Sequence, residues 1–396
     1  MIRKRLAILL VLISIVFLLS GCSWGPKSET IVIPGTEDEH LADSGSKPFK
    51  VKTIYRLPVT DTAQLLGWID SESVVGLFQE GIVTTRDMQD SLQRLAPPYK
   101  QLEKMQRMDN DLGYLKLSPN GKHIIGFKKA RDGLVVKLIS LSNGSEKNIA
   151  TLVPPEEQLL TKLEWSDNSR YISYLVTTDI DTVPGRSSKP EIKYSPIKLA
   201  VYDTMADQIK YYLLKGRQFT YSVSGAKMSD DGQSVLINCG PSELNTSIAM
   251  GTIEGTSVEI QYEHQMDSEQ MTWLNKDQFV FLGTEGVLYE YDRRNKVLTV
   301  LLERVLSFQL SQDRKYIAYS QKDNDSVSIF AGKLQGNNVL YKESVYQGVS
   351  PAEMYWSLQN NSLLVIGRKM YSATKQSVNS VPSPDSPNQP FIIRFQ

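Results

Sequence analysis

One sequence pattern recurs seven times between Val51 and Gln396. An apolar or aromatic anchor residue is followed, in most copies, by a serine, a turn and a run of four to six mostly apolar residues. The anchors are Trp68, Leu117, Trp165, Met228, Trp273, Leu310 and Trp356. Because a short unit of this kind cannot bury its apolar face alone, repeated units must pack against their neighbours. The chain is therefore expected to fold as an array of similar units.

The residues between the anchor and the apolar run are typical of a tight turn. In the clearest copy, Ser118 suits the first position of a type I turn, Pro119 presets φ at the second, and Gly121 suits the fourth. Apolar runs on both sides of such a turn predict a β-hairpin. Two further strands follow in several copies, for example residues 134–139 after the first hairpin. Four antiparallel strands per repeat form one blade of a β-propeller.

The spacing of the anchors supports the same fold. Successive anchors are 49, 48, 63, 45, 37 and 46 residues apart, close to the roughly 40–50 residues of a propeller blade. Tandem immunoglobulin-like domains would repeat at roughly 100 residues. We therefore predict an all-β protein, a β-propeller of about seven four-stranded blades, with six or eight blades left open. The segment Val51–Tyr55 is expected to pair into the last blade, beside a final strand at 391–395.

The repeat resembles the Ser-x-Asp-Gly-x-x-Ile-x-Tyr motif of TolB-like β-propellers, which are related to the WD-repeat class. The resemblance covers most of the region from Val51 to Gln396 and implies the propeller fold, but little about function. Only the copy from Met228 to Gly232 approaches the full motif, and the Trp-Asp and Gly-His signatures are missing.

The N-terminus has the features of an export signal. Arg3, Lys4 and Arg5 precede an apolar run of 14 residues, 6–19, which is shorter than the roughly 20 residues of a membrane-spanning helix. An ordinary signal peptide would favour an Ala-x-Ala-like cleavage site, and none is present. The ending Leu-Ser-Gly-Cys at 19–22 resembles the lipobox of bacterial lipoproteins. This resemblance implies cleavage between Gly21 and Cys22 and lipidation of Cys22.

These features divide the chain into three parts: a lipoprotein signal peptide at 1–21, a lipidated N-terminus and flexible tether at 22–50, and the propeller domain at 51–396. Small, polar and turn-forming residues dominate the middle part, which predicts a flexible segment. A tether of that length spans on the order of 30 Å. We expect an extracytoplasmic protein held on a membrane by its N-terminal lipid; whether this is the plasma membrane or an outer membrane is left open.

Charge and cysteine content exclude two classes of protein. The chain has 44 basic and 44 acidic residues, and loss of the three basic residues of the signal leaves a net charge of −3. This balance argues against a nucleic-acid partner. The only cysteine besides Cys22 is Cys239, so a disulfide framework is excluded and Cys239 is expected to be a buried apolar residue.

No motif points to catalysis. From Val51 onward the sequence has no Gly-x-Ser-x-Gly nucleophile elbow, and no phosphate-binding glycine loop is found. The histidines, His40, His123 and His264, are too few and scattered for a zinc cluster with one thiol. Aspartate pairs at 109/111, 179/181 and 323/325 do not continue into a calcium-binding loop. We therefore predict no catalytic residue, no metal site and no cofactor.

The longest interval between anchors contains an insertion around Thr177 to Lys193, whose composition predicts an exposed loop. Its role is left open between a functional loop and a tolerated surface insertion. The four anchor tryptophans are expected to lie in the core between blades. The sequence thus favours a membrane-anchored extracytoplasmic scaffold that binds a protein, a peptide or a cell-wall component. The alternative is an enzyme or small-ligand sensor with its site at the central channel of the propeller.

Overall fold

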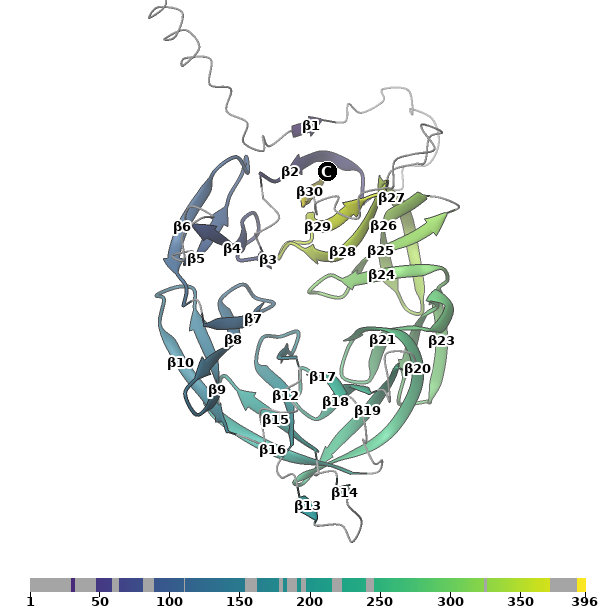
Figure 1. Cartoon of the computed structure of the whole chain (residues 1–396). Helices are drawn as coiled ribbons and strands as arrows, with labels where there is room; N and C mark the ends of the chain where they lie inside the picture. Colours follow the sequence, from purple (N-terminus) through teal and green to yellow (C-terminus); the bar gives the residue numbers. More distant parts are fainter. Residues whose placement is uncertain are drawn as a thin grey trace, which may run out of the picture.

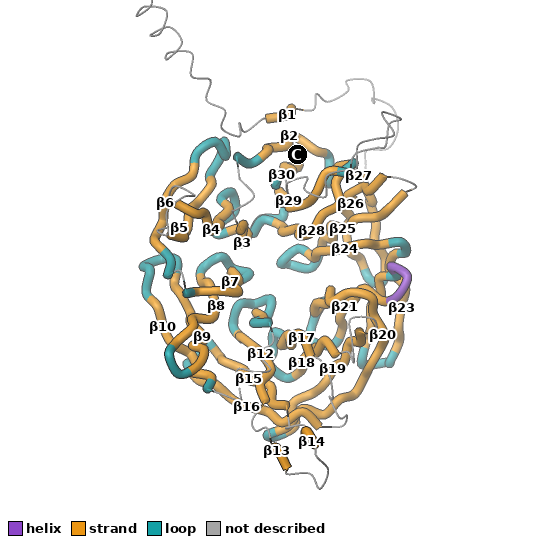
Figure 2. The backbone as a smooth tube through the Cα atoms, viewed as in Figure 1, coloured by secondary structure: helices purple, strands orange, loops and turns teal. Residues whose placement is uncertain are grey.

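A computed structural model describes residues 30–32, 48–58, 64–80, 89–109, 111–153, 162–177, 181–183, 191–193, 197–215, 223–239, 246–323, 326–370 and 390–396 of the 396-residue chain. Within these residues the secondary structure is almost entirely β-strand, with one short 3-10 turn at Thr284–Gly286 (Figure 2).

The described strands form seven antiparallel blades arranged in a ring, which confirms the predicted β-propeller (Figure 1). Three blades are separate four-stranded sheets. Blade 1 contains β3 (Gln64–Trp68), β4 (Val74–Glu80), β5 (Gln89–Leu95) and β6 (Leu102–Arg107). Blade 2 contains β7 (Leu112–Leu117), β8 (His123–Ala130), β9 (Gly133–Ser140) and β10 (Glu146–Leu152). Blade 6 contains β24 (Val305–Leu310), β25 (Tyr316–Asp323), β26 (Ser326–Gln335) and β27 (Asn338–Gln347).

Blades 3, 4 and 5 are hydrogen-bonded into one continuous sheet. Blade 3 contains β11 (Glu164–Trp165), β12 (Tyr171–Thr177), β15 (Ile197–Asp203) and β16 (Gln208–Lys215). Blade 4 contains β17 (Val223–Met228), β18 (Ser234–Cys239), β19 (Thr246–Glu254) and the first part of β20 (Ser257–Trp273). Blade 5 contains the last part of β20 with β21 (Gln278–Gly283), β22 (Leu288–Asp292) and β23 (Val297–Leu302).

The long strand β20 is what joins these blades. Its first part pairs with β19 as the outer strand of blade 4, and its last part pairs with β21 as the inner strand of blade 5, after a register shift between Met266 and Met271. Its first residues also run parallel to the end of β16 in blade 3. The outer edge of blade 3 is therefore partly covered by backbone hydrogen bonds instead of facing solvent.

Blade 7 joins the two ends of the chain. It contains β28 (Val349–Trp356), β29 (Ser362–Lys369), β30 (Phe391–Phe395) and, from the N-terminal side, β2 (Val51–Arg56). The antiparallel pairing of β2 with β30, for example Ile54 opposite Ile393, confirms the predicted ring closure. Hydrogen bonds between distant parts of the sequence thus hold the ring shut.

Two features of this blade fall in the segment 22–50 that the sequence assigns to a flexible tether. The short strand β1 (Thr30–Val32) pairs with β2 at the outer edge of the blade (Figure 1). Phe49 is 2% exposed, and its ring lies 6.1 Å from that of Trp356 and 5.7 Å from that of Phe395. The packing of the domain therefore includes a residue before Val51, because one aromatic ring in a polar segment can still fill an apolar gap.

The serine of the repeat has a structural role in five blades. Its side-chain oxygen accepts a hydrogen bond of 2.8–3.1 Å from the backbone N–H five residues later, in the copies at Ser118, Ser166, Ser229, Ser311 and Ser357. In the first of these turns, Gly121 N–H also bonds the carbonyl of Ser118 at 2.8 Å, as predicted for a type I turn. The hydroxyl groups of these serines therefore stabilise the turns.

The anchors end the inner strands of all seven blades. The four tryptophans among them are at most 7% exposed, which confirms their predicted place between blades. Each indole N–H donates to a carbonyl on the inner strand of the preceding blade, over 2.8–3.3 Å. In every case the accepting residue directly precedes the anchor of that blade, so the tryptophans tie neighbouring inner strands together.

The insertion between β12 and β15 carries a small hairpin. β13 (Asp181–Val183) pairs with β14 (Glu191–Lys193), and the hairpin projects from the rim of blade 3 in Figure 1. Residues 184–190, at the centre of the predicted exposed loop, lie outside the described residues. The insertion is thus attached to the outside of the ring and away from its axis.

Candidate functional site

A cavity of about 780 Å³ lies at the centre of the ring, and all seven blades contribute to its wall. The residues one and three positions before each anchor line it in every blade. They are Gly67, Lys116, Glu164, Lys227, Thr272, Gln309 and Tyr355 in the first set, and Leu65, Tyr114, Lys162, Gly225, Gln270, Ser307 and Glu353 in the second. Each inner strand ends at its anchor, just before the turn. The residues three positions before the anchors therefore lie nearer the start of the strand, and those one position before lie nearer the turn.

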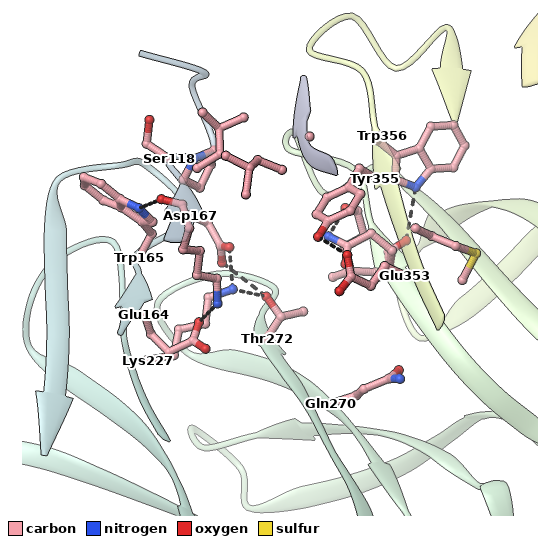
Figure 3. A pocket seen from close by; sticks show the side chains of 18 of the residues that line it. Ser118, Glu164, Trp165, Asp167, Lys227, Gln270, Thr272, Glu353, Tyr355 and Trp356 are labelled. Carbon is pink, nitrogen blue, oxygen red and sulfur yellow. Dashed lines mark hydrogen bonds and ion pairs between the residues drawn. The ribbon is translucent and has the colours of Figure 1, made fainter. Parts of the chain in front are cut away.

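An ion-pair network crosses the wall at the turn end. Lys227 Nζ lies 2.6 Å from Asp167 Oδ1, and Arg314 Nη2 lies 3.1 Å from Asp167 Oδ2 and 2.7 Å from Asp230 Oδ2. Thr272 completes the network, because Lys227 Nζ donates to its Oγ1 at 2.9 Å (Figure 3). These side chains come from blades 3, 4, 5 and 6, so the network ties four blades together.

Asp167 and Arg314 are held in their charged forms by their partners. Burial alone would raise the pKa of Asp167, but the cations Lys227 and Arg314 outweigh it and lower the pKa below the usual value of 3.8. Burial likewise opposes the charge of Arg314, yet Asp167 and Asp230 raise its pKa. Asp167 and Arg314 therefore form a buried ion pair that links blades 3 and 6.

Two further ion pairs neutralise charge in the wall. Lys116 pairs with Glu164 between blades 2 and 3, and Lys162 pairs with Glu269 between blades 3 and 5. Burial raises the pKa of Glu269, but the bonds to Lys162 and Ser224 and the lysine charge lower it overall. These pairs neutralise Lys116 and Lys162 with carboxylates of other strands in the wall.

Blade 7 contributes a tyrosine and a carboxylate. Tyr355 Oη donates to Glu353 Oε2 at 2.6 Å, and burial raises the pKa of Tyr355 well above its usual value (Figure 3). Opposite it, blade 1 has Gly67 with φ +129°, where an added Cβ would lie 3.7 Å from the ring of Tyr355. This is an ordinary van der Waals distance, so it is the backbone conformation that favours glycine at position 67.

Tyr114 is the most exposed aromatic residue of the wall. It lies on β7 with 79% of its surface exposed and φ +53°. Among the described residues, its ring makes one aromatic contact, an edge contact with Phe127 at 6.2 Å between centroids. A non-glycine residue on left-handed backbone with an exposed ring in a cavity is a candidate for ligand contact.

Six of the seven repeat anchors, all but Met228, line the cavity together with the turn residues Ser118 and Pro119. The lipobox residues, Cys239, His123 and Asp109 lie away from it or outside the described residues. Gly21 and Cys22 precede the described residues. Cys239 is 6% exposed on β18, as predicted for a buried apolar residue, and burial lowers the pKa of His123 at the start of β8. Asp109 pairs with Lys128 near blade 2. None of these described residues lines the cavity.

Two features are lacking among the described residues. No group of three or more histidine, cysteine, aspartate or glutamate side chains within them could hold a metal ion. No helix within them is long and apolar enough to span a membrane.

The cavity residues carry no local motif, which is why sequence reasoning missed them. They belong to seven different repeats, and each is an ordinary strand residue. The register of the repeat is the signal that would have found them, because alternate residues before each anchor must face the same side of the inner strand. Their pairing across blades depends on ring geometry.

Comparison with known proteins supports the fold. No protein-family model matches the sequence, and a search of curated proteins gives no match. An oligogalacturonate lyase in complex with manganese matches with a TM-score of 0.54 and 10% identity, over 93% of this chain and 98% of its own. An acylaminoacyl peptidase from Pyrococcus horikoshii matches with a TM-score of 0.50 and 12% identity over 78% of this chain. This chain covers 50% of that peptidase.

TolB from Acinetobacter baumannii is also similar, with a TM-score of 0.39 and 11% identity over 67% of this chain and 62% of its own. At such identities a structural likeness concerns the fold alone, because one fold hosts many functions. The chain is a β-propeller.

Proposed function

We propose that this protein is a lipid-anchored extracytoplasmic scaffold whose propeller binds a ligand or a partner segment in its central cavity. One observation carries the proposal. The cavity is lined by all seven blades, and its lysines and Arg314 are paired with carboxylates in the wall. A wall with internally paired charges and exposed polar groups suits recognition of a ligand.

The same pairing argues against acid–base catalysis in the cavity. A general acid or base works best with a pKa near the operating pH. The paired cations instead lower the pKa of Asp167 and Glu269. The repeat serines are buried and hydrogen-bonded to turn backbone. These groups are therefore better suited to binding a ligand than to catalysing a reaction.

A cross-linking experiment in native membranes tests the binding role. A photoreactive phenylalanine analogue at Tyr114 places the probe in the cavity, while the same probe at Tyr341, 54% exposed on β27 of blade 6, is the matched control on the rim. We expect a specific adduct from the cavity position only. Adducts from the rim alone, or from neither position, would contradict the proposal.

The lipid anchor rests on the sequence, where the residues at 19–22 match a lipobox and a polar segment follows. Two or more lipid chains are needed for stable anchoring. Cys22→Ala should abolish metabolic lipid labelling and release the protein from membranes or leave it uncleaved. Cys239→Ala changes the buried cysteine and should leave the labelling intact. Labelling that survives in Cys22→Ala would refute the anchor.

One comparison favours a second candidate, an enzyme with its site in the cavity. The matching oligogalacturonate lyase extends over nearly all of this chain. Incubation with oligogalacturonate and Mn²⁺, followed by chromatography of the products, separates the two candidates. Turnover that falls in a cavity variant such as Tyr114→Ala would favour the enzyme, and intact substrate would favour the scaffold.

A further inference from the structure

Blade 4 breaks the pattern of the cavity wall. In the other blades the described lining residues belong to the inner strand, its approach or the turn that follows it. In blade 4 the cavity also reaches Asn238, which lies on the second strand, β18. Asn238 stands opposite Gly225 of the inner strand in the pairing of β17 with β18, next to a β-bulge between Val223 and Gly225. The missing side chain at Gly225 leaves the second strand open to the cavity.

Neither backbone nor packing requires glycine at this position. Gly225 has no left-handed φ, whereas Gly67 and Gly121 do. A Cβ added to Gly225 would lie 3.9 Å from Glu164 Cγ and 4.0 Å from Lys162 Cβ, which are ordinary van der Waals distances. The effect of Gly225 is therefore to leave Asn238 accessible from the cavity.

Asn238 lowers the stability of the fold at its position. It is 2% exposed, and its Oδ1 has no hydrogen-bond partner in the described part of the chain. Its strand neighbours Ile237 and Cys239 are buried apolar residues. Leaving a buried polar group unsatisfied costs about 1–3 kcal/mol, so an apolar side chain would suit the fold better. A group supplied by a ligand would satisfy the amide.

Gln270 provides a second amide in the same wall. The backbone N–H of Phe308 donates to Gln270 Oε1 at 2.9 Å, which fixes the orientation of the side chain. Gln270 lines the cavity, and its Nε2 has no hydrogen-bond partner among the described residues. Figure 3 shows Gln270 extending apart from the ion-pair network. Gln270 lies on the part of β20 that enters blade 5, next to blade 4 in the ring, and its bond to Phe308 reaches blade 6. Both amides line the same cavity.

We propose that Asn238, Gln270 and the opening at Gly225 form a subsite for a neutral saccharide, with Tyr114 on the same cavity wall as a stacking surface for a sugar ring. This inference rests on the binding role proposed above. Amide side chains can donate to and accept from hydroxyl and acetamido groups, and an exposed aromatic face suits the C–H face of a sugar. The flanking ion pairs Lys162–Glu269 and Lys227–Asp167 are already neutralised, so a charged ligand would have to compete with them.

Calorimetric titration of the detergent-extracted, lipid-anchored protein tests the subsite. The probes are tri-N-acetylchitotriose, maltotriose and cellotriose, with the cationic trimer of glucosamine and a capped trialanine peptide as comparisons. We expect at least one neutral trisaccharide to bind and the cationic trimer to bind at least about tenfold more weakly, a difference of about 1.4 kcal/mol. Binding of the peptide without any saccharide would overturn the saccharide assignment.

Two variants separate a ligand role of Asn238 from a structural one. Asn238→Leu should weaken saccharide binding about tenfold or more and raise the melting temperature by about 2 °C, because it removes an unsatisfied amide. Gly225→Val should weaken binding by closing the opening, with the melting temperature retained. Unchanged binding in both variants would overturn the subsite. A lower melting temperature in Asn238→Leu would also overturn it, since it would show that the amide serves the fold.

The two proposals fail in different ways. The scaffold proposal is tested by the Tyr114 cross-link in native membranes, which requires no knowledge of the ligand. If that adduct forms but none of the neutral trisaccharides binds, the saccharide subsite is refuted and the scaffold stands. If the adduct is missing, the binding role itself fails.

Discussion

The two ends of the cavity wall use polar residues in opposite ways. At the turn end, Asp167, Lys227, Arg314 and Asp230 satisfy one another within 3.1 Å across blades. At the strand-start end, Asn238 is buried with an unsatisfied oxygen. The first group stabilises the ring, and the second costs stability that an apolar residue would avoid. Residues that break local rules without a structural benefit are the ones expected to serve function.

The largest expected effect comes from breaking the turn-end network. Asp167→Ala leaves Lys227 and Arg314, 16% and 19% exposed, without their shared carboxylate. Removing one partner of such a buried group costs about 3–5 kcal/mol. Urea denaturation should show a loss at the lower end of this range, because the side chains retain some solvent contact.

An exposed ion pair provides the matched control for that variant. Lys215 pairs with Glu259 at 3.2 Å, where the two side chains are 53% and 36% exposed. Exposed pairs are screened by solvent and contribute little, so Lys215→Ala should leave the denaturation midpoint nearly unchanged. Equal losses of stability in the two variants would show that the turn-end network stabilises the fold no more than an exposed ion pair does.

The next largest effect concerns the tryptophans that tie inner strands. Trp273 is 1% exposed and donates to the carbonyl of Lys227 at 3.0 Å. Trp273→Phe should cost about 2 kcal/mol, since it removes that bond and leaves a small void. Met228→Leu changes an anchor without such a bond and should cost less than about 1.5 kcal/mol. A larger loss in Met228→Leu would contradict the tie.

Acid should weaken the turn end more gradually. The pKa of Asp167 is lowered in the folded protein by Lys227 and Arg314, despite the opposing effect of burial. A lowered pKa gives stability that is fully present above the usual value of 3.8 and is lost as the pH falls below it. Melting temperatures measured between pH 6 and pH 2 should therefore fall less in Asp167→Asn than in the wild type. Parallel curves would refute this contribution.

The smallest effect is expected where the wall is open. Gly225→Ala should change the free energy of unfolding by less than about 0.5 kcal/mol, as at an unconstrained site. Gly121→Ala is the contrast, because Gly121 has φ +71° and an added Cβ would lie 2.5 Å from the carbonyl oxygen of Ile69. It should cost more than about 1 kcal/mol. Similar losses in both variants would mean that Gly225 is needed for packing.

The sequence alone determined the blades, because each blade is specified locally. Turn residues such as Ser118 and Gly121 act on backbone within five residues, and the anchors recur at the blade period. The closing pair β2 and β30 was also predictable, since a ring of repeats must join its ends. Phe49 was missed because a single ring in a polar segment carries no periodic signal.

Only the tertiary structure decided the cavity. Asp167 and Arg314 are 147 positions apart in the sequence and meet because blades 3 and 6 face one axis. The same ring geometry leaves Asn238 behind Gly225 at the edge of the cavity, although its own strand reads as an ordinary buried one. Hydrogen-bond satisfaction is a property of three-dimensional neighbours, whereas strand and turn propensity is a property of sequence neighbours. The fold could therefore be predicted from local patterns, and the candidate site could not.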